Sequence, residues 1–188
     1  MGKRLGFFAC VLGAVLLLLA GGFLLKNHRE EIMAEDHSRL VLRELERAIP
    51  ASPQEVPEGS ALTVQGEAYC AILSIPALDL TLPVLENWSY PLLKLAPCRQ
   101  AGSIQTGDLV IAAHNYDSHF GRLSTLEPGT TVLLTDTSGN RYTYILSHLQ
   151  ELSPYSTDTV LSGEYQLVLY TCTPGGSRRI AAFCIREN

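Results

Sequence analysis

The sequence predicts a mainly β domain of about eight strands, either a closed barrel or a sandwich, behind a long N-terminal helical segment. Three observations support this: an uncharged apolar run of 21 residues near the N-terminus, a following stretch rich in helix formers, and short turn-bounded apolar segments beyond residue 62. About eight strands in a domain of this size favour closure, because a closed sheet has no exposed edge. The 188 residues fit one modest domain with an appendage.

The apolar run extends from Leu5 to Leu25 without a charge. At 1.5 Å per residue, a helix of 21 residues covers the roughly 30 Å hydrocarbon core of a bilayer. A cleaved signal peptide is the alternative, since Lys3 and Arg4 form a basic leader, but its apolar region is usually about 7–15 residues long. We therefore expect an uncleaved membrane anchor over residues 1–27.

The distribution of charge does not determine the membrane orientation, but it does indicate which classes of partner the remaining chain can bind. Lys3 and Arg4 on one flank of the apolar run face Lys26 and Arg29 on the other, so the positive-inside rule leaves the orientation open. From Glu30 onward, ten Lys and Arg oppose nineteen Asp and Glu, a net charge of −9. This charge argues against a general affinity for nucleic acid or anionic lipid, and favours a peptide or small molecule as partner.

The segment after the apolar run predicts a stalk helix and a linker. Residues 28–49 are rich in helix formers and include Glu35 and Arg39, an i,i+4 ion pair. Residues 50–60, PASPQEVPEGS, contain three prolines among polar residues, which excludes a continuous helix. We assign residues 28–61 to stalk and linker, and residues 62–188 to the folded domain.

Within that domain, short apolar segments rich in β-branched and aromatic residues predict strands. They are YCAILSI (69–75), LTLPVLE (80–86), DLVIAAHN (108–115), TTVLLTD (130–136), RYTYILSHL (141–149), EYQLVLYTC (164–172) and RRIAAFCIR (178–186). An additional short strand is expected around Ser103. The stretch TDTSGNRY (135–142) is typical of a hairpin, and residues 88–97 and 118–128 predict short helices.

The five cysteines, at positions 10, 70, 98, 172 and 184, show neither a CxxC pair nor the spacing of a zinc site. Two disulfides are possible among the four outside the apolar run, but spacing does not establish them, and free thiols are equally compatible. Cys10 lies near the start of the apolar run and not behind it, which argues against lipoprotein processing. Cys70, Cys98 and Cys184 have the surroundings of small buried residues in strands.

Cys172 differs because it ends an apolar run directly before a glycine turn and two arginines, LVLYTCTPGGSRRI (167–180). If residues 174–177 form a four-residue loop, Cys172 pairs with Arg179; a loop longer by one residue would pair it with Arg178. The β-carbons of directly opposite residues are roughly 4.5–5.5 Å apart, so a guanidinium can favour a thiolate or bind an oxyanion there. Cys172 is therefore a candidate nucleophile.

A thiol nucleophile usually needs a base, and the histidines are at positions 28, 37, 114, 119 and 148. The first two lie in the stalk, and His119 and His148 have positions more typical of surface or packing residues. His114 ends the apolar run LVIAA as Cys172 ends its own, so a barrel could bring both to one rim. Cys172, His114 and one arginine form the candidate catalytic group.

These residues resemble the motifs of sortases, cysteine transpeptidases of Gram-positive bacterial surfaces. Sortases carry a His after a strand, later a Leu-x-Thr-Cys at a strand end, and then an Arg opening the last strand. The matching stretches here are AAHN (112–115), LYTC (169–172) and RRI (178–180), and SIPALDLTLPV (74–84) is similar to the family's opening strand pair. The resemblance covers roughly residue 69 to the C-terminus and implies a closed, eight-stranded sortase-like β-barrel.

The sequence departs from the family pattern at two positions. Ala113 stands where the family usually has Gly, and Val168 where it has Thr; Ala can replace a strand Gly if no positive φ is required. The family Arg commonly precedes a hydrophobic run, which favours Arg179 and leaves Arg178 as the alternative. The short Cys-to-Arg loop looks more like sortase classes B, C or D than class A.

The resemblance implies that Cys172 attacks a Leu-Pro-x-Thr-Gly-like sorting signal, with His114 as general acid and base. Arg179 would stabilise the oxyanion, with Thr171 and Arg178 supporting substrate binding. The acceptor would be an amine, from cell-wall peptide or a pilin lysine, or water. No metal or cofactor is implied; some family members respond to calcium, but no acidic cluster here predicts a calcium site. The enzyme would be a single-pass membrane protein with its catalytic domain outside the cell.

Two other classes of protein are alternatives to a sortase-like enzyme. A papain-like protease also uses Cys and His, but its Cys comes first and begins a helix, whereas His114 precedes Cys172 here. The second class is a non-catalytic, membrane-tethered β-barrel module that binds a peptide. Replacement of Cys172 without loss of function, or a disulfide between Cys172 and Cys184, would favour that module over an enzyme.

Overall fold

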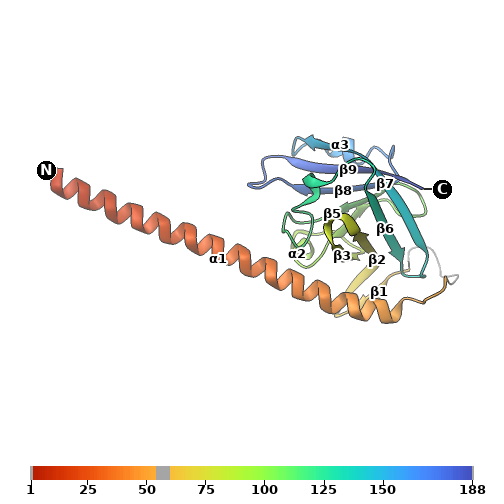
Figure 1. Ribbon diagram of the computed structural model, residues 1–188. Helices are drawn as coiled ribbons and strands as arrows, with labels where there is room; N and C mark the ends of the chain where they lie inside the picture. Colours follow the sequence, from red (N-terminus) through yellow and green to blue (C-terminus); the bar gives the residue numbers. More distant parts are fainter. Residues whose placement is uncertain (1, 54–59, 188) are drawn as a thin grey trace.

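In the computed structural model, which describes residues 2–53 and 60–187, a long helix leads into a β-barrel (Figure 1). Helix α1 (Gly2–Ala48) runs without a break through the predicted anchor and the predicted stalk. It ends just before Pro50, the first proline of the chain, because the residue before a proline disfavours helical geometry. Large apolar side chains from Phe7 to Leu25 are exposed on it. Among the described residues, α1 is the one helix long and apolar enough to cross a membrane.

The barrel is built from short strands joined by turns and four short helices. The strands are β1 (Leu62–Val64), β2 (Glu67–Ile75), β3 (Leu80–Leu85), β4 (Cys98–Ala101), β5 (Leu109–Ala112), β6 (Thr131–Asp136), β7 (Arg141–Leu152), β8 (Leu167–Cys172) and β9 (Arg179–Arg186). The short helices are η1 (Pro76–Leu78), α2 (Tyr90–Leu93), η2 (Leu123–Thr125) and α3 (Thr157–Val160).

The sheet closes on itself. Its strand order is β1-β2-β3-β4-β5-β8-β9-β7-β6, and β2 also pairs with β6. Strands β2 to β9 therefore form a closed, eight-stranded barrel, and β1 adds a short ninth strand beside β2. The predicted fold class, a closed eight-stranded barrel with short helices behind a long apolar helix, is confirmed.

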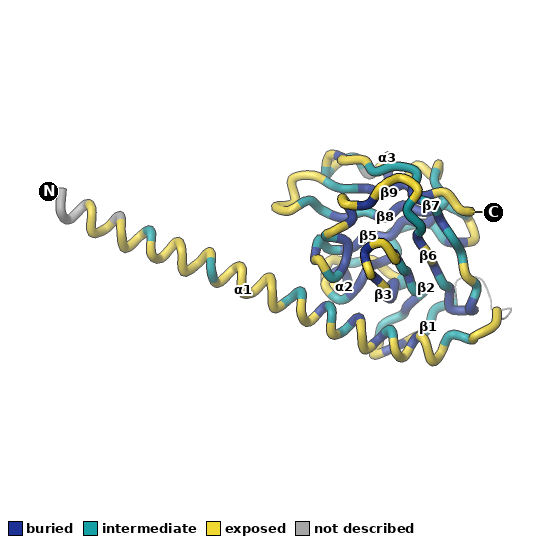
Figure 2. Tube along the Cα trace, in the orientation of Figure 1, coloured by how far each residue is buried: buried dark blue, intermediate teal, exposed yellow. Residues whose placement is uncertain are grey.

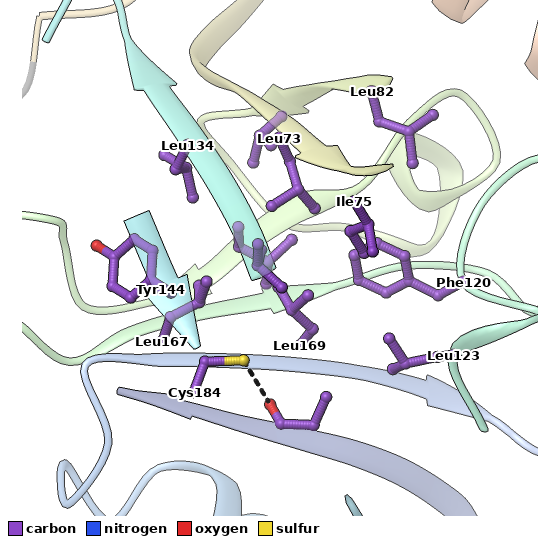
Figure 3. Close-up of a cluster of buried hydrophobic side chains, with 14 of the residues drawn as sticks. Leu73, Ile75, Leu82, Phe120, Leu123, Leu134, Tyr144, Leu167, Leu169 and Cys184 are labelled. Atoms are coloured by element: carbon purple, nitrogen blue, oxygen red, sulfur yellow. Dashed lines mark hydrogen bonds between the residues drawn. The ribbon is translucent and has the colours of Figure 1, made fainter. Parts of the chain in front are cut away.

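Alternation along the strands places one set of apolar side chains inside the barrel. In β2 every second residue from Ala71 to Ile75 is buried in the barrel core, and β6 alternates in the same way with Val132 and Leu134 inside. Figure 3 shows the resulting core, where Phe120 and Leu123, from the connection between β5 and β6, fill the interior beside Ile75. Burial of such side chains contributes about 1.5–3 kcal/mol each.

Parallel pairing determines which strand ends meet. Strands β5 and β8 pair in parallel, with Ala112 opposite Tyr170, although η2, β6, β7 and α3 separate them in the sequence. Strand β9 then pairs antiparallel with β8 and places Arg179 opposite Cys172. The ends of β5 and β8 and the start of β9 therefore lie at one rim of the barrel.

The second half of α1 packs against the barrel. Ala34, Ser38, Val41 and Leu45 are buried, and their spacing places them on one face of the helix. Val41 and Leu45 belong to a core cluster that also contains residues of β1, β2 and β3. Figure 2 shows the change along α1, from an exposed first half to a second half with buried positions. The barrel and this part of α1 share a core, and the domain boundary near residue 62 stays a prediction.

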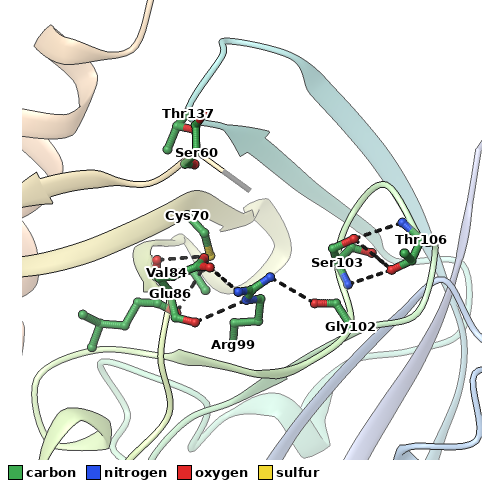
Figure 4. A network of polar contacts seen from close by, with 10 residues as sticks. Ser60, Cys70, Val84, Glu86, Arg99, Gly102, Ser103, Thr106 and Thr137 are labelled. Atoms are coloured by element: carbon green, nitrogen blue, oxygen red, sulfur yellow. Dashed lines mark hydrogen bonds and ion pairs between the residues drawn. The ribbon is translucent and has the colours of Figure 1, made fainter. Parts of the chain in front are cut away.

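A polar network fixes the connection between β4 and β5 (Figure 4). Arg99 forms an ion pair with Glu86, donates to the Glu86 carbonyl (3.2 Å) and donates to the Gly102 carbonyl (3.3 Å). Gly102 has φ +65°, and a Cβ there would lie 2.1 Å from the Asp108 carbonyl oxygen, so only glycine fits. The network holds β4 against the end of β3.

Three local features differ from the sequence prediction. The extra strand lies at Cys98–Ala101 and not around Ser103, because Ser103 forms a turn in which its hydroxyl bonds that of Thr106 (2.8 Å). Strand β1 has three residues, too few to show a period. Helix α3 lies between two predicted strands, in a segment for which the sequence predicted no element. Such single-turn elements leave almost no periodic signal in a sequence.

Candidate active site

The β8–β9 hairpin has the register that the sequence predicted. Cys172 pairs with Arg179, and the Thr173 amide donates to the Arg178 carbonyl (3.0 Å). Residues 174–177 form the loop, in which Gly175 and Gly176 have φ +79° and +73°, values that favour glycine. The pairing brings the thiol and one guanidinium to the same side of the sheet.

The two adjacent arginines point to different surroundings. Arg179 lines a cavity together with Cys172, and its Nη1 donates to the carbonyls of Gly176 and Arg178 (3.0 Å each). Arg178 instead forms an ion pair with Glu151 on β7 and also donates to the Glu151 carbonyl (3.5 Å). Of the two, Arg179 is the one beside the thiol.

His114 follows β5 at the level where Cys172 ends β8. Each lies two residues beyond the paired Ala112 and Tyr170. Two hydrogen bonds tie these strand ends together: the Ala113 amide donates to the Tyr170 carbonyl (3.1 Å), and the buried Thr171 hydroxyl donates to the Ala113 carbonyl (2.9 Å). The structure thus brings His114, Cys172 and Arg179 to the same rim.

The cavity at this rim has a volume of about 280 Å³, near the lower end of typical ligand sites. It is lined by residues of β4, β5, β8 and β9, by the segment before and within α2, and by the segment from Leu152 to α3. The lining residues are Trp88, Tyr90, Leu93, Gln100, Ala112, Ala113, Leu152, Ser153, Pro154, Ser156, Val160, Tyr170, Thr171, Cys172 and Arg179. A mostly apolar site with one thiol and one guanidinium suits a short peptide better than a strongly charged ligand.

Aromatic residues of this cavity were missed by the sequence analysis. The rings of Trp88 and Tyr90 meet edge to face with centroids 5.1 Å apart, and the Tyr170 hydroxyl bonds the Gln100 amide oxygen. Tyr170 lies two residues before Cys172 in a strand, so period-two alternation could have placed both on one face. Trp88 comes from the segment before α2 and Gln100 from β4, and neither gave such a signal.

Burial controls the protonation of two groups near the rim. It lowers the pKa of His114, an effect strengthened by the Lys94 cation and opposed by the Glu30 carboxylate. Burial also raises the pKa of Tyr170 to about 12, so that its phenol stays protonated at neutral pH. The imidazole of His114 is therefore biased toward its neutral form, which can accept a proton.

The cysteines are free thiols throughout the described residues. A disulfide between Cys172 and Cys184 is excluded by register, because Cys184 pairs with Leu167, five residues along β8 from Cys172. Five strand residues span roughly 16 Å, whereas bridged Cα atoms lie within about 7 Å. Cys98 and Cys184 are buried, and burial raises their pKa to about 12, which suits packing and not reactivity.

Three other histidines have different surroundings. His119 is completely buried behind Tyr116 (centroids 5.5 Å apart), and His148 stacks on Phe183 (4.8 Å). His37 on α1 bonds the Tyr69 hydroxyl (3.0 Å). The residues that the structure describes contain no cluster of three or more His, Cys, Asp or Glu that could hold a metal ion.

Comparison with known proteins identifies a family match. Residues 73–186 match the model of the Sortase domain. Among solved structures, sortase A from Corynebacterium diphtheriae is similar over 65% of this chain and 62% of its own length, with TM-score 0.57 and 19% identity. Sortase C1 from Streptococcus agalactiae is similar over 68% of this chain and 71% of its own length, with TM-score 0.58 and 21% identity. Sortase E from Streptomyces avermitilis is similar over 64% of this chain and 88% of its own length, with TM-score 0.54 and 24% identity. No curated protein matches the sequence.

Proposed function

We propose, from the premise that this chain belongs to the sortase family, that it is a membrane-anchored cysteine transpeptidase. Its substrate would be a Leu-Pro-x-Thr-Gly-like sorting signal on a secreted surface protein. The product acyl group would pass to an amine of cell-wall peptide or of a pilin lysine, or to water. The catalytic residues that we assign are Cys172 as nucleophile, His114 as general acid and base, and Arg179 as oxyanion donor.

The observation that carries this proposal is the arrangement at the rim. Cys172 pairs with Arg179 across β8 and β9, and both residues line an apolar cavity. Cys172 also ends its strand level with His114, which is not itself among the residues that line the cavity. A thiol beside a base and a fixed cation is the arrangement that acyl transfer requires. Thr171 supports the proposal by tying the two strand ends together.

The first half of the reaction forms a thioester. The Cys172 thiol gives its proton to His114, and the thiolate adds to the carbonyl carbon of the signal threonine. Arg179 and backbone amides near Cys172 stabilise the resulting oxyanion. The bond to glycine then breaks, and His114 returns the proton to the leaving amine. The neutral form that burial favours for His114 prepares it for the first of these proton transfers.

The second half resolves the thioester. The acceptor amine adds to the thioester carbonyl and loses a proton to His114, and the new amide forms as the Cys172 thiolate departs. Water in place of the amine gives hydrolysis. Arg178, which is held by Glu151, would affect the substrate mainly through the shape of the hairpin.

The anchor and the side of the membrane belong to the same proposal. The exposed apolar first half of α1 would span the bilayer, and the barrel would lie on the extracellular side, where sorting signals and acceptor amines meet. The exposure of Leu17, Leu18 and Leu24 on α1, at 73% or more, would be unfavourable in water.

A cleavage assay with the full chain in detergent micelles tests the function. Pentapeptides that vary at each position of the sorting signal are incubated with and without an added amine, and products are separated by chromatography. We expect cleavage after threonine, an amine-dependent new product, and loss of both with Cys172→Ala. Specific peptide binding without cleavage would contradict the proposal and would favour the non-catalytic binding module.

A further inference from the structure

Helix α1 touches the loop that follows His114. The Tyr116 hydroxyl donates to the Glu30 carboxylate (3.4 Å), and the Asp117 amide donates to the Glu31 carboxylate (2.8 Å). Each bond joins residues 86 positions apart in the sequence. The membrane-spanning helix is therefore attached directly to the loop that begins with the assigned general base.

Tyr116 links this attachment to the imidazole. The rings of Tyr116 and His114 stack with centroids 4.8 Å apart and planes 20° apart, and Tyr116 is only 5% exposed. The loop backbone is itself bonded, because the Phe120 amide donates to the His114 carbonyl (3.1 Å). Among the described residues, no side chain is hydrogen-bonded to the His114 ring. Stacking on Tyr116 is therefore the ring contact of His114 that these residues show.

Charged groups surround this pair of rings. Glu30 forms ion pairs with Lys94, next to α2 (3.3 Å), and with Lys26 on α1 (3.9 Å). Glu31 faces the Asp117 amide, and His119 lies behind Tyr116 with its pKa lowered to about 4, mainly by burial, so that it is neutral near pH 7. Near the imidazole, the Glu30 carboxylate thus offsets the Lys94 cation.

We propose that Tyr116 and Glu30 are positioning residues for His114: Glu30 holds the Tyr116 ring, and the ring holds the imidazole at the barrel rim. This inference rests on the proposed function, which gives His114 the proton transfers. Glu30 lies five residues beyond Leu25, the last residue of the apolar run, or about 8 Å along a helix. The anchor helix would therefore orient the general base and also fix its distance from the membrane surface.

The test compares variants of the full chain in detergent micelles. Tyr116→Leu removes the stacked ring, Tyr116→Phe removes only the hydroxyl, and Glu30→Gln removes only the charge. Glu35→Gln is the matched control, because Glu35 lies on the same helix and pairs with Arg39 away from the loop. The readouts are kcat and KM for amine transfer and the pKa of His114, followed by NMR in chains with 13C-labelled histidine.

The two positions should shift the pKa of His114 in opposite directions. Tyr116→Leu should raise it, because burial is the main cause of its lowering, and Glu30→Gln should lower it further, because Lys94 loses its counter-charge. Tyr116→Leu should reduce kcat about tenfold with little change in KM, because Tyr116 is not part of the cavity lining. For Tyr116→Phe, kcat and the pKa of His114 should lie between those of Tyr116→Leu and the wild type. Glu35→Gln should behave as the wild type.

Unchanged kcat and an unchanged His114 pKa in Glu30→Gln and Tyr116→Phe would overturn the positioning role. Those two variants keep the size of each side chain, so they remain informative if Tyr116→Leu fails to fold. A parallel loss of kcat and melting temperature without a shift in the His114 pKa would reduce the contact to a purely structural one and would also overturn it. If the wild type transfers no peptide while the pKa of His114 shifts as predicted, the positioning contact stands and the proposed function fails.

Discussion

The β6–β7 and β8–β9 hairpins lie at opposite ends of β7 (Figure 1). They differ in how the polar groups of their turns are bonded. In the β6–β7 turn, buried Asp136 accepts hydrogen bonds from Ser138 (2.9 Å), from the amide and side chain of Asn140 (2.9 Å each) and from Tyr142 (3.0 Å). In the β8–β9 turn, residues 174–178 are exposed, and main-chain bonds hold the loop together with the half-buried side chains of Thr173 and Arg179.

The difference shows where the barrel is stable and where it can react. At Asp136 a buried carboxylate accepts four hydrogen bonds within the hairpin, so its removal costs folding free energy. At the other hairpin, Cys172 and Arg179 are half-buried beside a cavity, and their polar atoms can meet a ligand. The comparison predicts that stability and activity can be altered separately, at opposite ends of the same strand.

The largest expected effect is on stability. Asp136→Ala should lower the free energy of unfolding by about 3 to 4 kcal/mol, because buried donors lose their acceptor. Denaturant unfolding measures this change, with exposed Asp36→Ala on α1 as the control. The rate per folded molecule should stay within twofold of wild type. A loss of activity larger than the loss of folded protein would contradict the claim that stability and activity can be altered separately.

The next effect is on catalysis. Arg179→Ala should reduce kcat/KM about 100-fold, or roughly 2.7 kcal/mol, with little change in melting temperature, because it removes an oxyanion donor. Arg178→Ala is the matched control and should cost less than tenfold, because its guanidinium pairs with exposed Glu151. Equal losses for both arginines would show that the hairpin acts only through its shape.

The comparison can be sharpened at the rim itself, because the loop after β5 contains a fully buried histidine. Burial, with the His114 charge, lowers the pKa of His119 from 6.5 to about 4. As the pH is lowered, His119 therefore takes up its proton in the unfolded state before it does so in the folded state. The free energy of unfolding falls as the pH drops below about 6.5 and levels off below about 4. Between pH 7 and 5 the loss should be about 2 kcal/mol.

His119→Phe should remove this part of the pH dependence of unfolding, whereas exposed His28→Phe should retain it. The measurement is denaturant unfolding at several pH values. Identical pH profiles for wild type and His119→Phe would show that His119 is not held neutral in the folded state.

The smallest expected effect comes from the bond between the strand ends. Thr171→Val keeps the side-chain volume but removes the hydrogen bond to the Ala113 carbonyl, and should cost about 1 kcal/mol of stability and less than tenfold in kcat. Thr125→Val removes an exposed bond to the Arg122 carbonyl and should cost less. An effect on kcat greater than that of Arg179→Ala would give Thr171 a direct role in the reaction.

Much of the fold followed from local pattern. Alternation and turn residues located the barrel strands, and the glycine loop of the β8–β9 hairpin gave the pairing of Cys172 with Arg179. For β5 and β8, the sequence predicted only that a barrel could bring their ends to one rim. It did not predict their parallel pairing, because register between distant segments leaves no local signal. The packing of α1 was not foreseen, since an amphipathic face predicts burial but not the partner.

For the candidate site, the sequence predicted the residues that carry chemistry better than those that surround them. Cys172, His114 and Arg179 have distinctive neighbours in the chain, and the structure brings them to one rim. Trp88, Gln100 and Val160 line the cavity from three separate segments, so only the folded chain shows that they belong together. The contact of Glu30 with Tyr116 depends on where α1 packs against the barrel, so it could not be predicted from the sequence either.

The central claim is that Cys172 forms the acyl-enzyme, and a direct test is to trap that intermediate. The full chain is mixed with a cleavable sorting peptide without an amine, quenched in acid, weighed by intact mass spectrometry and digested to locate the adduct. We predict one acyl group, attached to Cys172 by a thioester that hydroxylamine removes, and none in Cys172→Ala. An acyl group on another residue, or turnover that persists in Cys172→Ala, would contradict the account.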